Sequence, residues 1–467
     1  MTNASRVSIR GYNSNSLFLA VIFVIISSLI ADVSLSNISD ITSVSTSWGF
    51  TAFIAITIVY AVGQYFILGF LKSKRIKMKS PYFSKLSIAV IIVQFVLTAI
   101  IVFIILQILV SSYYDTYTLI LGTSISYVTA SILMAILALM FLSWYRSNRS
   151  LVFLLYGISS IVVSISIVSS IVFFTAILLR MQEEIHPQPQ QHALEEHEEQ
   201  EEVGHGPDIR KFDPSTTLGI VQIVFTVSRI GSFLLLWGST TLLLHTYSQK
   251  LGKVKFWTII GIPIASFLSI YIIVTPFVLA FSHNSSTDDT TFVIIIEVLG
   301  YTLPAIISSI LFGLPFWIIS RTLRYGSILK DYMIITASGL VLFGLASSGN
   351  VILAPYPPLG LASVSFVGLS SYMILIGIYS SAISISEDEK LRRYIRKTAA
   401  EESKLLGSIG FAQMEQQIRK KVTHVIKVQS DNIIENSGVQ TSLTEYEIKE
   451  YLDEVLQEIK VSKERGK

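Results

Sequence analysis

The chain has 467 residues, of which 51% are hydrophobic and only 14% are charged, and its mean hydropathy is +0.62. This balance lies well above the apolar share and below the charged share of soluble domains, so it predicts an integral membrane protein. The absence of cysteine excludes disulfides, thiolate metal sites, iron–sulfur clusters and cysteine nucleophiles. Because the formal net charge is only +3, the distribution of Lys and Arg among the loops is more informative than their sum.

Ten apolar segments are long enough to cross a bilayer core of about 30 Å, which requires about 20 helical residues. They lie at 15–34, 50–71, 86–110, 117–143, 151–179, 216–245, 256–281, 292–320, 332–350 and 360–385. The predicted fold class is therefore all-α, a polytopic transmembrane helical bundle of ten spans with a cytoplasmic amphipathic helical tail. The expected parts are spans one to five in 1–180, an external loop in 181–214, spans six to ten in 215–386 and the tail in 387–467.

The loops divide by charge when they are taken alternately along the chain. One set carries Lys and Arg, most densely in "KSKRIKMKSPYFSK". The other set is nearly bare, and its loops without Lys or Arg lie at 35–49, 111–116, 282–291 and 351–359. Because positively charged loops face the cytoplasm, we expect both termini in the cytoplasm and 181–214 on the outside of a cell membrane.

The first apolar segment has two interpretations. Arg6 and Arg10 precede "SLFLAVIFVIISSLIADVS", an order that also fits a secretory signal cleaved near Ala31. A retained span is favoured because the apolar run is long for the core of a signal peptide.

A histidine-rich and acidic segment, "EEIHPQPQQHALEEHEEQEEVGHGPD", separates the two sets of five spans. Its candidate metal ligands are His186, His192, His197 and His205. Their spacings match no defined zinc or copper motif, yet imidazoles among carboxylates bind Cu²⁺ or Zn²⁺ weakly even in a flexible loop. A solvated acidic linker is the favoured interpretation, with weak metal capture and pH sensing by histidine as alternatives.

Two ionisable residues interrupt predicted spans: Arg229 in "VFTVSRIGSF" and Glu297 in "FVIIIEVLGY". An arginine at mid-span costs about 2.5 to 3.5 kcal/mol, so it requires a partner or a wet cavity. Spans six and eight run in the same direction, and the pattern therefore predicts an Arg229–Glu297 ion pair that locks the bundle. Only Asp32, at the outer edge of span one, adds a further acidic group, which weakens the case for an ion-coupled transporter.

The two halves of the bundle differ in the residues that shape their helices. Span four carries Gly122, Ser126 and Ala130 at four-residue spacing, a pattern typical of close helix packing. Span eight carries Pro304 and Pro315 three turns apart, so both bend the helix in the same sense. Bent helices of this kind either line a cavity or serve as ordinary bundle parts.

The tail contains two amphipathic stretches. The first runs from "SEDEKLRRYIRK" to Val425, with an interruption expected at Gly407 and Gly410, and a polar break follows at "QSDNIIENSGVQ". The second, "SLTEYEIKEYLDEVLQEIK", opens with a capping box from Ser442 to Glu445. Helices of this length must cover their apolar faces with each other, a second copy, the membrane or another protein, so residues 388–467 are expected to mediate a homo-oligomer or a protein partnership.

"EDEKLRRYIRKTAAEESKLLGSIGFAQMEQQI" together with "LTEYEIKEYLDEVLQEI" resembles a group of uncharacterised multi-span membrane proteins of ammonia-oxidising archaea. The resemblance covers span ten and the tail and implies an archaeal cytoplasmic membrane. The residues taken alone are also compatible with a bacterial membrane.

The functional prediction is a non-enzymatic membrane sensor, adaptor or structural subunit that acts through its tail, because no phosphate-binding loop, catalytic triad or metalloprotease motif is present. The alternative is a small-solute or metal-ion transporter built around the proline-bent helices. The expected partners are the lipid bilayer and proteins at the tail, with no nucleic acid, and the expected cofactors are none beyond weakly bound Cu or Zn.

Overall fold

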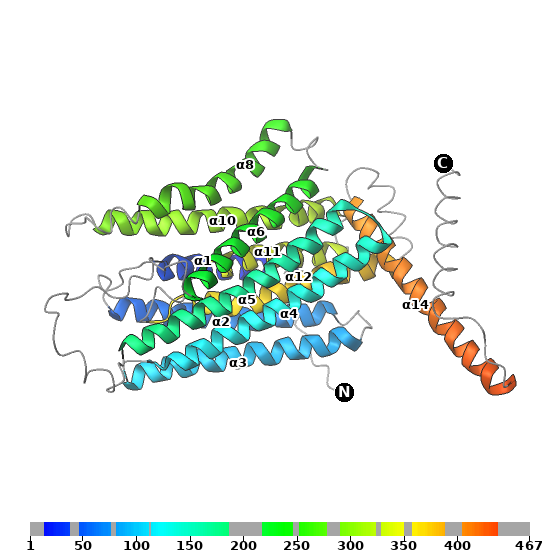
Figure 1. Cartoon of the computed structure of the whole chain (residues 1–467), viewed down its shortest axis with the longest axis horizontal. Coiled ribbons are helices and arrows are strands. Elements are labelled where there is room, and N and C mark those ends of the chain that lie inside the picture. Colours follow the sequence, from blue (N-terminus) through cyan, green and yellow to red (C-terminus); the bar gives the residue numbers. More distant parts are fainter. Residues whose placement is uncertain are drawn as a thin grey trace, which may run out of the picture. The chain divides into compact units, whose positions relative to one another are not determined.

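Every regular element in the described part of the chain is a helix (Figure 1). The computed structural model describes residues 14–37, 46–75, 81–111, 114–185, 217–245, 252–277, 290–323, 328–349, 357–387 and 404–437. The chain forms two compact units: the first comprises Met1–Leu142 and Leu151–Ser380, and the second comprises Ser143–Ser150 and Ser381–Lys467.

Ten of the helices are long and apolar enough to cross a membrane, as the sequence predicts. They are α1 (Ser14–Ser36), α2 (Thr46–Arg75), α3 (Pro81–Ser111), α4 (Thr116–Ser147), α5 (Leu151–Ile185), α6 (Thr217–His245), α8 (Lys253–Ser269) continued by the π-helix η2 (Ile270–Val274), α10 (Thr290–Thr322), α11 (Ile328–Ala346) and α12 (Leu361–Glu387). The prediction of a polytopic helical membrane protein is therefore confirmed in architecture. The π-turn in the seventh span was not predicted.

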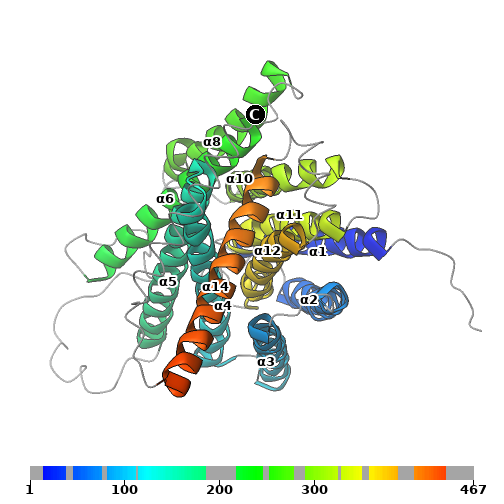
Figure 2. The same ribbon diagram turned by 90° about the vertical axis from the view of Figure 1, so that its right-hand side faces the viewer.

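Helix α12 forms the centre of the first unit. All residues of its most apolar window are buried, whereas only 28% and 11% of the corresponding windows of α3 and α6 are buried. The end-on view shows α11 and α12 surrounded by α1, α2, α4 and α10 (Figure 2). The innermost span is thus shielded by protein, and the outer spans are left to contact lipid.

Small residues allow the neighbours of α12 to approach closely. At Gly377, an added Cβ would lie 2.8 Å from the carbonyl oxygen of Tyr332 on α11. Ser126 Oγ on α4 donates a hydrogen bond to the Val364 carbonyl oxygen of α12 at 2.6 Å. The small-residue pattern of span four therefore packs against the central helix, as the sequence predicts for such a pattern.

The outer helices expose large apolar side chains, which suits contact with lipid. Helix α3 shows this most clearly, since Ile88, Phe95 and Phe103 are each more than half exposed. In water such a surface would be unfavourable, but in a bilayer it replaces lipid–lipid contact at little cost. The lipid bilayer is therefore the natural environment of the first unit.

The described part of the tail is one helix, α14 (Lys404–Ser437). The expected interruption at Gly407 and Gly410 was wrong, because the helix continues through both glycines. The expected polar break also begins too early, since the helix runs through Gln429 and ends at Ser437. Residues 388–403 and 438–467 lie outside the described residues.

Candidate functional site on the tail helix

The four histidines singled out in the sequence, His186, His192, His197 and His205, lie outside the described residues. Their metal-binding role stays a prediction. Within the described part of the chain, no group of three or more His, Asp or Glu side chains is arranged to hold a metal ion.

Arg229 is exposed on α6, and its guanidinium carbon lies 5.9 Å from the centre of the Phe225 ring. Glu297 lies on α10, but its side chain is not among those described. Helices α6 and α10 contact each other, which is the arrangement that the pair requires. The Arg229–Glu297 ion pair therefore stays a prediction, while the Phe225 ring gives the cation a favourable neighbour.

In the first unit, the Asp32 carboxyl group accepts three hydrogen bonds. It is completely buried on α1, where Oδ1 accepts a hydrogen bond from Gly360 N–H at 2.9 Å. Its Oδ2 accepts two more, from Ser363 N–H at 2.8 Å and from Ser363 Oγ at 2.6 Å. Sequence reasoning placed Asp32 at the outer edge of span one without finding these partners.

The turn before α12 explains why that helix needs an acceptor from elsewhere. Gly360 has a φ of 88°, in the left-handed region that favours glycine, and its carbonyl oxygen accepts the first helical bond from Val364. A side chain at the position before a helix normally accepts hydrogen bonds from the first backbone N–H groups, but glycine has none to offer. Asp32 supplies this cap from another helix, and its carboxyl oxygens lie at the positive end of the helix dipole.

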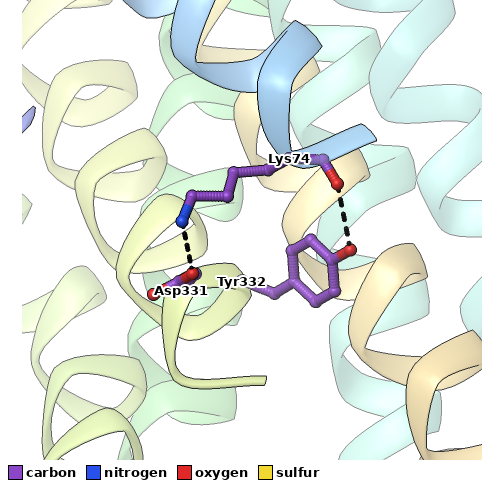
Figure 3. Close-up of polar contacts among 3 residues, drawn as sticks. All are labelled: Lys74, Asp331 and Tyr332. Atoms are coloured by element: carbon purple, nitrogen blue, oxygen red, sulfur yellow. Dashed lines mark hydrogen bonds and ion pairs between the residues drawn. The ribbon is translucent and has the colours of Figure 1, made fainter. Parts of the chain in front are cut away.

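A second polar contact joins α2 to the start of α11 (Figure 3). Lys74 Nζ lies 2.7 Å from Asp331 Oδ2, and Tyr332 Oη donates to the Lys74 carbonyl oxygen at 3.4 Å. The Lys74 ammonium also lies 5.3 Å from the centre of the Phe70 ring. These contacts hold the C-terminal end of α2 against the start of α11, which is a structural role.

Uncharged side chains form a third polar cluster inside the bundle, between α2 and α3. Tyr60 Oη donates to Gln94 Oε1 at 3.1 Å, and Gln64 donates to Thr98. The four-residue spacing on each helix places both members of a pair on one face, so the two pairs meet along the helix contact. Such bonds strengthen helix association in lipid and do not by themselves mark a binding site.

The second unit contains a further set of polar contacts, between side chains of α4 and α14. Three hydrogen bonds join α14 to the C-terminal end of α4. Trp144 Nε1 donates to Gln413 Oε1 at 3.0 Å. Ser147 Oγ donates to Glu415 Oε2 at 2.5 Å, and Gln416 Nε2 donates to Ser143 Oγ at 3.0 Å.

The docked face of α14 follows helical spacing. Its buried side chains recur at three-residue steps and are Leu406, Ile409, Ala412 and Glu415, and Gly410 beside them is also buried. At Gly410, an added Cβ would lie 2.7 Å from Ile385 Cβ on α12, so the glycine permits a close approach of the two helices. Buried apolar side chains thus provide the contact area of α14. The three hydrogen bonds fix its position along the end of α4.

Glu415 is the charged centre of this contact. Only 5% of its surface is exposed, and a buried carboxylate requires hydrogen-bond donors or a cation. The Ser147 hydroxyl supplies a donor, and Arg419 Nη2, one turn further along α14, lies 3.6 Å from Glu415 Oε1. Removal of one donor would therefore weaken the contact by more than an ordinary surface substitution would.

Sequence reasoning predicted that the tail helix requires a partner, but not that the end of α4 provides it. Trp144, near the end of α4, is buried and donates a hydrogen bond to Gln413. The available signal was a group of polar residues at the end of α4 and another group in α14, which is too general to predict that the two helices pair. Comparison of the chain with family models, curated proteins and solved structures finds no match.

Proposed function

We propose that this chain is a multi-pass membrane sensor or adaptor subunit, not an enzyme, and that it acts through protein contacts made by its tail. The observation that carries the proposal is the docking of α14 on the end of α4 by three side-chain hydrogen bonds. A tail held in this way presents a fixed helix for recognition, because the contact restricts the positions that the helix adopts.

Helix α4 is suited to couple the bundle to the tail. It has 32 residues, so it spans about 48 Å at 1.5 Å per residue. At its start, the Asp115 N–H donates a hydrogen bond to Gln107 Oε1 of α3, and at its middle Ser126 is bonded to α12. A continuous helix with contacts at its start, middle and end moves as one piece, so a shift in the bundle reaches the residues that hold α14.

The orientation proposed for the chain places both termini in the cytoplasm of a cell membrane. Support comes from the Lys and Arg residues, which gather in alternate loops. The resemblance of the tail to a family from ammonia-oxidising archaea supports an archaeal membrane. In this orientation α14 meets cytoplasmic proteins.

Affinity capture of the full chain from native membranes tests the proposal. Tagged wild-type protein should retain a defined partner after mild crosslinking, and the triple variant Trp144→Phe, Ser147→Ala, Gln416→Ala should retain several-fold less. The matched control is Gln417→Ala, which changes the neighbouring glutamine without removing any of the three bonds. Equal capture by the triple variant, or no partner with any variant, would contradict the adaptor role.

Transport of a small solute or metal ion is the rival function, and one observation favours it. The π-helix Ile270–Val274 lies against α10, the helix that contains Pro304 and Pro315. π-Turns and prolines occur often where helices line functional cavities. A water-soluble maleimide should leave Val274→Cys unlabelled if the bundle is solid, whereas labelling in intact membranes would favour transport.

A further inference from the structure

Helix α14 also has an exposed face. On it Ile418, Val425 and Val428 are 41%, 57% and 45% exposed, and Lys421 between them is also exposed. The steps of three, four and three residues place all four side chains on one side of the helix. We call these four residues the basic stripe.

The basic stripe lies in a stretch of one charge sign. Residues 416–430 contain four basic residues and no acidic residue. An apolar stripe of this kind needs a cover, and the positive charge selects an acidic one. It also disfavours a second copy of α14, because like charges would then face each other.

The chain itself supplies an acidic segment with a matching apolar stripe. Residues 442–460 contain six acidic and two basic residues. Their apolar residues recur at helical steps and are Ile448, Leu452, Val455 and Ile459. Glu447, Glu454 and Glu458 flank this stripe on one side at the same period.

Chain length also favours an intramolecular cover. Helix α14 ends at Ser437, and the capping box of the acidic segment begins at Ser442, which leaves a four-residue connector at 438–441. Helices joined by so short a connector become antiparallel neighbours, and the tether raises the effective concentration of one for the other to the millimolar range. No external partner has this advantage.

We infer that residues 442–460 fold back as a helix on the basic stripe of α14 and form an antiparallel hairpin with it. The connector sets the register, in which Val428 meets Leu452, Val425 meets Val455 and Lys421 lies beside Glu458. The hairpin covers the part of α14 that the contact with α4 leaves open. A partner that binds the basic stripe must first displace the acidic segment, so the hairpin adds a regulatory step to a tail-based adaptor.

The absence of cysteine makes a direct test simple, because two introduced thiols are the only ones present. The full chain in bilayer nanodiscs carries Val425→Cys with Val455→Cys and is treated with a short bifunctional methanethiosulfonate linker. The matched control pairs Val425→Cys with Gln457→Cys, which lies on the opposite side of the acidic segment. We expect an intramolecular crosslink at least ten-fold faster in the first pair than in the control.

A charge test on the same pair separates specific docking from collision. Lys421→Glu should slow the crosslink several-fold, and adding Glu458→Lys should restore it. High salt should slow it as well, because partly exposed charges are screened. Lys421 and Val425 are exposed on α14, and size-exclusion chromatography checks that each variant keeps its fold.

Three results would overturn the inference. Crosslinks between two chains would assign the basic stripe to a second copy. Equal rates in the test and control pairs would show random collision of a loose tail. Protection of the thiol introduced at 425 by anionic but not by neutral nanodiscs, without any crosslink, would assign the basic stripe to the lipid surface. None of these results would alter the contact between α4 and α14, so the inference and the proposed function fail separately.

Discussion

At the scale of single residues, the cap that Asp32 provides for α12 is the best-defined interaction of the first unit. A buried carboxylate accepts three donors, and two of these are backbone N–H groups at the start of the central helix. In an apolar surrounding, backbone donors without acceptors cost free energy. Asp32 thus joins α1 to α12, the central helix of the first unit.

Replacement of Asp32 should therefore destabilise the bundle. Asp32→Ala leaves the N–H groups of Gly360 and Ser363 without an acceptor, and we expect a loss of about 2 to 4 kcal/mol in the free energy of unfolding. Ser363→Ala removes only one of three bonds and should cost about 1 kcal/mol. Thermal unfolding in detergent measures both, and equal stability of Asp32→Ala and wild type would refute the cap.

Arg229 and Glu297 are expected to pair, because a charged side chain within a span requires a partner. A double-mutant cycle with Arg229→Ala and Glu297→Ala should give a coupling free energy of about 1 to 3 kcal/mol in detergent unfolding. The double variant should then be more stable than the sum of the single losses implies. Additive losses would show that the Phe225 ring and water satisfy Arg229 without Glu297.

The four histidines between spans five and six are expected to bind Cu²⁺ or Zn²⁺ weakly. Ordering the chain around an ion costs about 1 to 2 kcal/mol for each residue fixed, which limits the affinity. Only neutral imidazole coordinates, so affinity should fall as the pH drops through about 6.5. Calorimetry on a peptide of residues 181–214 measures this, and heat unchanged after replacement of all four histidines would exclude them as ligands.

At the scale of elements, the packing of α11 on α12 depends on missing side chains. Gly377→Ala would push a methyl group against Thr336 and the Tyr332 carbonyl oxygen, and we expect it to destabilise the fold by about 1 to 3 kcal/mol. Gly261→Ala in α8 is the matched control, because nothing lies within 4 Å of its added Cβ. Helix propensity alone should make the control neutral or slightly stabilising. The same thermal shift for both would show that α11 and α12 are loosely packed.

The elements could be predicted from the sequence, whereas most of their contacts could not. Span length and hydropathy are set by the bilayer, so all ten predicted spans overlap spans of the structure. The helix through Gly407 and Gly410 was missed because tertiary packing on Ile385 outweighs the low helix propensity of glycine. The Asp32 cap was missed because its donors are backbone groups more than 300 residues away, and backbone donors leave no signal in the side-chain sequence.

At the scale of the whole molecule, the proposed function rests on coupling between a membrane-spanning helix and the tail. The core of the first unit is a buried helix, which suits a rigid support more than a wide passage. Within the second unit, hydrogen bonds join three residues at the end of α4 to three residues of α14. A sensor or adaptor requires this combination of a firm support and a fixed recognition helix.

The most direct test of this coupling is the proximity of α4 and α14 in a membrane. The full chain with Ser143→Cys and Gln416→Cys, in nanodiscs, should form an intramolecular crosslink through a short bifunctional thiol linker, because the two wild-type side chains are hydrogen-bonded at 3.0 Å. The pair Ser143→Cys and Gln417→Cys is the matched control and should react far more slowly. A crosslink formed at least ten-fold faster in the first pair is the predicted result, and equal rates with both thiols freely labelled by maleimide would contradict the docking of the tail.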